Sequence, residues 1–124
     1  EEQLCQRLAE FIRSGDTVVT TWRLDGHPDH EATGRACARM CAQCGAHLLE
    51  APVWAWHWAC VADARLPWHR ARRLMLDGRA AAGKREAVQV FASQLQPDPS
   101  TGAPPVLPPS MVARAARPFE IFFV

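Results

Sequence analysis

Long apolar runs, a strong net charge and glycine-rich loops are all missing from this sequence of 124 residues, and each absence excludes a class of protein. No apolar stretch is long enough to span a bilayer, so we expect no membrane-spanning segment. A formal net charge of +1 gives no electrostatic reason to bind nucleic acid or an acidic membrane surface. No glycine-rich loop follows an apolar strand, which excludes both the dinucleotide-binding fingerprint and the P-loop.

The five cysteines form no even, regularly spaced set, which argues against a disulfide framework. Cys37, Cys41 and Cys44 have the spacing of one type of iron–sulfur motif. The same spacing fits one face of a helix, and free cysteine is among the most buried side chains, so we expect these three in the core. Free thiols, and a first segment that does not resemble a secretory leader, favour a reducing, cytoplasmic location.

Apolar periodicity predicts helices that alternate with short apolar strands. This alternation favours an α/β fold, specifically a Rossmann-like, three-layer α/β/α arrangement with a mostly parallel sheet. Six of the ten prolines lie between residues 96 and 110, which predicts an extended loop there. The expected helices cover residues 2–13, 31–43, 80–95 and 110–116, and the expected strands cover residues 17–22, 48–53, 72–76 and 119–124.

The length is that of a single domain, covering residues 1–124. The number of strands is nevertheless low for a complete doubly wound domain. The chain also begins with Glu1 rather than Met, so we expect it to be part of a longer protein. An incomplete sheet predicts an exposed strand edge where the remainder would pair.

The stretch richest in reactive side chains is residues 25–31, Asp-Gly-His-Pro-Asp-His-Glu, which follows the expected strand 17–22. Ligands bind at this carboxyl end of the strands in open α/β sheets. Pro28 suits a first helical turn, and residues three apart at a helix start share a face. His27 and His30 are therefore expected to converge, with Asp29 free to bond a ring N–H. The alternative is that both histidines are surface residues and that Asp29 only caps the helix.

The His-Pro-Asp-His run resembles the second motif of the PIG-L/LmbE-like family of zinc-dependent N-deacetylases, which remove acetyl groups from amino sugars and related glycoconjugates. The likeness continues through residues 49–54, through Lys84 with a Ser-Gln pair after it, and through residues 117–122. It therefore covers most of the chain from about Asp16 onward.

The resemblance implies a role for each residue of the motif. His30 would be a ligand of zinc, or of another divalent metal as the cofactor. His27 would face the substrate carbonyl, and Asp29 would orient His27. The family's first motif, His-Pro-Asp-Asp-Glu, which supplies two more ligands and the general base, does not occur in this sequence.

Taken together, the motif and its missing counterpart predict the C-terminal part of a metal-dependent hydrolase, without the N-terminal half of its domain. The expected reaction removes an acetyl or other acyl group from the amide of an N-acyl amino sugar or glycoconjugate, and we expect the 124-residue chain alone to be inactive. The alternative is a non-catalytic binding or interaction module of the same fold that needs a partner segment. Association into oligomers is compatible with both.

Three further residues are candidates for substrate binding. His57 and Trp56 follow the second expected strand, and an indole ring can stack on a sugar ring. The alternative for both is an ordinary place in an aromatic core. Lys84 is a candidate through the family resemblance, and its alternative is a solvated position on a helix.

Overall fold

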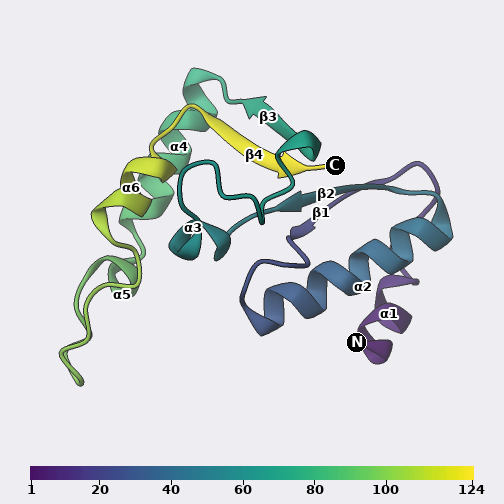
Figure 1. Ribbon diagram of the computed structural model, residues 1–124, viewed down its shortest axis with the longest axis horizontal. Helices are drawn as coiled ribbons and strands as arrows, with labels where there is room; N and C mark the ends of the chain where they lie inside the picture. Colours follow the sequence, from purple (N-terminus) through teal and green to yellow (C-terminus); the bar gives the residue numbers. More distant parts are fainter. The chain divides into compact units, whose positions relative to one another are not determined.

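The computed structural model describes the whole chain, residues 1–124, and the chain divides into two compact units. The first unit contains Glu1–Arg72 and Ile121–Val124, and the second contains Arg73–Glu120. The elements, in chain order, are α1 (Glu2–Leu8), β1 (Thr17–Thr21), α2 (Pro28–Cys44), β2 (His47–Ala51), α3 (Ala55–Trp58), η1 (Trp68–Arg70), β3 (Ala71–Met75), α4 (Gly78–Gln89), α5 (Ala92–Leu95), α6 (Pro109–Ala115) and β4 (Phe119–Phe123) (Figure 1).

The sheet is mixed, with the strand order β1-β2-β4-β3. β1 and β2 run parallel, whereas β2 and β4 run antiparallel. The backbone N–H of Val124, after β4, donates a hydrogen bond to the carbonyl of Arg70, before β3. The N–H of Leu76, after β3, donates to the carbonyl of Pro118, before β4, so this pair is antiparallel too. The prediction of an α/β chain is confirmed. The mostly parallel, Rossmann-like sheet is not confirmed, because only one strand pair is parallel.

In the first unit, α2 lies against β1 and β2, and α1 packs beside α2 (Figure 1). Their apolar faces form one core with Cys5, Ile12, Ala36 and Met40 buried in it. Val18 of β1 packs against the same core. β1 ends the strand order and is therefore an edge strand. Val19 on β1 is 60% exposed, so its side of the strand is not covered by the core.

A second core in the same unit is built mainly of aromatic rings. Trp22, which directly follows β1, meets Phe123 of β4 edge to face at 5.1 Å between ring centroids, and Trp58 lies 6.4 Å away on another side. Trp56 and Trp58 of α3 are partly buried against this core. The aromatic-rich segment after β2 therefore forms a short helix whose rings pack against Trp22 at the end of β1.

The predicted helix over residues 2–13 ends earlier, at Leu8. The next residues form turns, and the Arg13 guanidinium donates hydrogen bonds to the carbonyl groups of Ala9, Glu10 and Ile12. These carbonyls thus gain a side-chain donor in place of the helical N–H groups. Phe11, within the range of the predicted helix, is 68% exposed.

The second unit contains α4, α5 and α6. Asp77 caps α4 by accepting a 2.7 Å hydrogen bond from the backbone N–H of Ala80. The single helix predicted over residues 80–95 is wrong. This part of the chain forms two helices, α4 and α5, because Phe91 between them has a non-helical ψ of 65°. None of the chain's helices combines the length and the apolar character needed to cross a bilayer.

Candidate functional site

The segment between β1 and α2 is shaped by a glycine and a proline. Gly26 has a φ of +83°, and a Cβ there would lie 2.6 Å from the indole nitrogen of Trp58, so no other residue fits without strain. Pro28 is the first residue of α2, as predicted, and extended backbone at His27 precedes it. Glu31, one turn into the helix, accepts a 3.0 Å hydrogen bond from the Gly26 N–H. The turn is therefore fixed from both sides.

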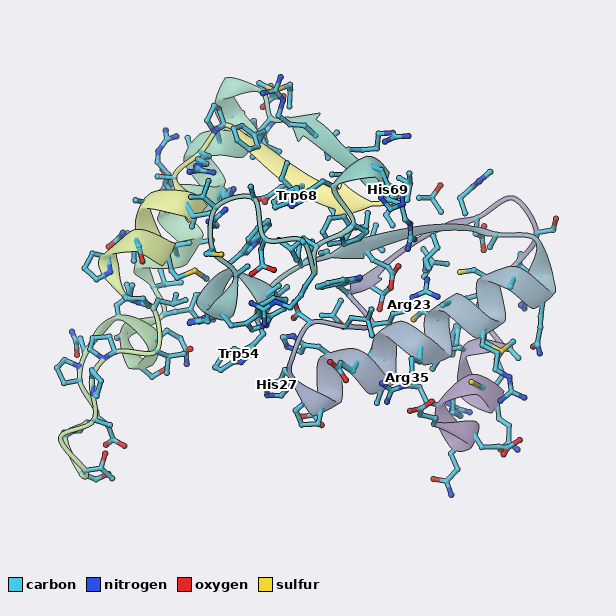
Figure 2. All side chains as sticks on the ribbon, in the orientation of Figure 1. Arg23, His27, Arg35, Trp54, Trp68 and His69 are labelled. Atoms are coloured by element: carbon cyan, nitrogen blue, oxygen red, sulfur yellow. The ribbon has the colours of Figure 1, made fainter.

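The two imidazoles of the motif lie together, as the i,i+3 spacing predicted. The ring centroids of His27 and His30 are 4.5 Å apart, with 35° between the ring planes. The ring of Trp54, just after β2, meets His27 edge to face at 5.6 Å, and Figure 2 shows these two side chains close together. The ring centroid of His57 lies 4.4 Å from that of Trp54. His30, His27, Trp54 and His57 thus form a continuous row of rings, which we call the aromatic row.

Asp25 is the carboxylate that serves this site. It is fully buried and accepts hydrogen bonds from the backbone N–H groups of Val53, Trp54 and Ala55 at 2.7–2.9 Å. Its Oδ2 also lies 2.5 Å from Nδ1 of His30. Asp25 was not among the residues predicted for this site.

The predicted pairing of Asp29 with His27 is wrong. Asp29 is exposed and forms no hydrogen bond or ion pair with either ring. The physical reason is position: Asp29 is the second residue of α2, two residues after His27, and side chains two apart do not face each other on a helix. Nδ1 of His27 is buried and has no hydrogen-bond partner.

A second buried carboxylate braces the same end of the parallel strand pair. Glu50 of β2 is fully buried and accepts three hydrogen bonds from Arg23, two from the guanidinium and one from the backbone N–H, at 2.7–3.1 Å. Arg70 reaches the same carboxylate at 3.3 Å. The hydrogen bond to Glu50 raises the pKa of Arg23, so the guanidinium stays charged. A single glutamate within an apolar strand was the only sequence signal for this brace.

The structure gives different surroundings to the three predicted substrate-binding residues. His57 is exposed and belongs to the aromatic row, whereas Trp56 is partly buried against the aromatic core. Lys84 lies in the second unit and pairs with Glu120 at 2.6 Å, and its ammonium group also reaches two backbone carbonyl groups at 3.4 Å. The ammonium group of Lys84 therefore has partners within its own unit.

The donor set suits part of a zinc site. His30 turns Nδ1 toward a carboxylate, which is the usual arrangement of a metal-bound histidine whose other nitrogen holds the ion. A catalytic zinc usually has three protein ligands, and no three histidine, cysteine, aspartate or glutamate side chains of the chain come together to hold a metal. The residues thus fit the role of one ligand, but they do not form a complete site. Cys37 and Cys41 are buried within α2, as expected for core residues, whereas Cys44 at the end of α2 is only partly buried against the core that α1 and α2 form.

Comparisons of this chain with protein-family models, with curated proteins and with solved structures find no match.

Proposed function

We propose that this chain contributes one side of the active site of a zinc-dependent N-deacetylase of the PIG-L/LmbE-like type, acting on an N-acyl amino sugar or glycoconjugate. The observation that carries the proposal is the pair of adjacent histidines that follows β1, one of them bonded to a buried carboxylate. The proposal also requires a Rossmann-like, mostly parallel sheet in the complete domain, to which β1 and β2 contribute a parallel pair.

Each side chain of the motif has a distinct task in this proposal. Nε2 of His30 binds the metal, while Asp25 holds Nδ1 on the other side of the ring. Zinc, when bound, polarises the amide carbonyl and lowers the pKa of a bound water. His27, whose ring lies beside that of His30, supplies a hydrogen-bond donor to the oxyanion that develops from that carbonyl. The rings of Trp54 and His57 continue the aromatic row beside the histidines, and the apolar face of a sugar can stack on them.

The experiment compares histidine variants of the complete product of the gene that encodes this chain. Zinc per protein and kcat are measured together, with an N-acetylglucosamine glycoside as substrate. His30→Ala removes a metal ligand, so zinc content and turnover should both fall. His27→Ala leaves the ligands in place, so zinc should remain while kcat drops on the order of 10²–10³-fold, as for other oxyanion donors. His69→Ala, which removes an exposed imidazole outside the site, is the matched control and should change neither quantity.

Three outcomes would contradict parts of this proposal. Loss of zinc in His27→Ala with retention in His30→Ala would reverse the two assignments. Unchanged turnover in both variants would show that this loop is not the active site. A complete gene product that neither binds zinc nor hydrolyses the glycoside would favour the non-catalytic binding module instead.

A further inference from the structure

We infer that Asp25 is the positioning residue of this site: a single buried carboxylate that sets the tautomer of His30 and the place of Trp54 at the same time. This role deepens the proposed function and rests on it only in the statement that Nε2 of His30 binds a metal ion. The hydrogen-bond geometry itself carries the rest. Asp25 touches no reacting atom in this scheme and acts through the residues that it holds.

The direction of every hydrogen bond at Asp25 is determined by its partners. The three backbone N–H groups of residues 53–55 can only donate, and they occupy both carboxylate oxygens. An ionised carboxylate offers about four acceptor positions and no donor. The fourth position faces Nδ1 of His30 at 2.5 Å, so this nitrogen carries a hydrogen and donates it.

This arrangement decides which nitrogen of His30 is free. A neutral imidazole has one N–H and one lone pair, and a hydrogen bond at one nitrogen selects the state of the other. With Nδ1 protonated, the lone pair of His30 lies on Nε2, the atom that a metal ion requires. Asp25 is the acceptor that faces Nδ1 of His30. Asp29, another carboxylate near this turn, is exposed and does not contact the ring.

The same carboxylate also orders the segment that carries the aromatic row. The N–H groups that it accepts belong to three consecutive residues at the start of α3, which has no side-chain cap of its own. Trp54, the middle residue, places its ring against His27 at 5.6 Å. The indole of Trp58 donates a 2.8 Å hydrogen bond to the backbone carbonyl of Asp25, which ties the far end of α3 to the same residue.

An Asp25→Asn substitution separates these effects, because its shape is conserved while one oxygen becomes a donor. The remaining oxygen should stay at Oδ1, where it accepts from Val53 and Ala55. The new amide nitrogen then faces the N–H of Trp54 and Nδ1 of His30. It can donate to Nδ1 only when that nitrogen is deprotonated, so His30 should change to the tautomer with its hydrogen on Nε2.

The test is long-range proton–nitrogen NMR of the metal-free protein, at a pH above about 8 where ordinary histidine is neutral. In the wild type, His30 should carry its hydrogen on Nδ1, and in Asp25→Asn on Nε2. A zinc chloride titration of the complete gene product should show a 10–100-fold weaker affinity in the variant, as is typical when the carboxylate behind a metal-bound histidine is lost. Asp29→Asn should keep the wild-type tautomer. Asp63→Asn, which alters another buried carboxylate in the same unit, controls for a general loss of stability and should keep both tautomer and affinity.

A wild-type protein with the hydrogen on Nε2 of His30 would overturn the inference, and this measurement needs no variant to fold. Retention of the wild-type tautomer and zinc affinity in Asp25→Asn would overturn it as well. The proposed function fails separately. If the tautomers behave as expected and the glycoside is not hydrolysed, Asp25 remains a positioning residue for a histidine that serves another reaction.

Discussion

Gly34 is the position where the packing of α2 leaves no room for a side chain. A Cβ there would lie 2.6 Å from the carbonyl oxygen of Thr21, 2.8 Å from the nitrogen of Arg23 and 2.9 Å from its Cα. All three are backbone atoms just where β1 ends, so no flexible side chain can move aside. A Gly34→Ala substitution must therefore push the helix away from the strand end.

The size of this effect follows from two opposing terms. Reaching an ordinary contact of 3.4 Å from the nearest atom requires a shift of about 0.8 Å, and overpacking of this kind costs roughly 1–3 kcal/mol. Three rigid contacts put the cost near the upper end. Alanine in a helix interior is better than glycine by about 1 kcal/mol. We therefore expect Gly34→Ala to lower the free energy of unfolding by about 2 kcal/mol.

Gly83 in α4 provides the matched control, because a Cβ there would meet nothing within 4 Å. Gly83→Ala gains only the helix propensity and should stabilise its unit by about 0.5–1 kcal/mol. Guanidinium denaturation can follow the two substitutions separately. All five tryptophans lie between residues 22 and 68 in the first unit, so their fluorescence reports on Gly34, while far-UV circular dichroism follows the helices of both units, including α4. A Gly34→Ala protein as stable as the wild type, or more stable, would refute the close contact between α2 and β1.

Two further predictions concern thiols and acid. Cys60 is exposed, whereas Cys37 and Cys41 are buried, and burial raises the pKa of Cys41. A thiol reagent should therefore label Cys60 first and Cys41 only on unfolding. Mass spectrometry of briefly labelled, folded protein checks this order, and early labelling of Cys41 would contradict it. Hydrogen bonds from Arg65 lower the pKa of Asp63, so this carboxylate stabilises the folded state above about pH 4 and progressively less below it. The stability difference between wild type and Asp63→Asn should therefore be largest near neutral pH and shrink in acid, as measured by urea denaturation at a series of pH values; a difference that grows in acid would refute the assignment.

The features that could be predicted from sequence were those decided by near neighbours. Pro28 at the first position of α2 and the three-residue spacing of the histidines are local signals, and the structure follows both. Strand direction is not local. β4 returns after the long proline-rich segment, and it lies antiparallel beside β2, with Phe123 opposite Glu50. A short apolar strand has the same composition in either direction, so periodicity could not distinguish the mixed sheet from a parallel one.

Asp25, rather than the predicted Asp29, is the carboxylate that binds a histidine of the motif. Spacing within the motif favoured the nearer carboxylate, yet the partner of Asp25 that matters most is a backbone segment almost thirty residues away. A signal for it was present. The start of α3 is Pro-Val-Trp-Ala, with no serine, threonine, aspartate or asparagine to accept its first N–H groups. Buried donors of this kind need an acceptor from elsewhere in the chain. A helix start that lacks its own cap is therefore a reason to search for a distant carboxylate, and here that carboxylate also holds a histidine of the candidate site.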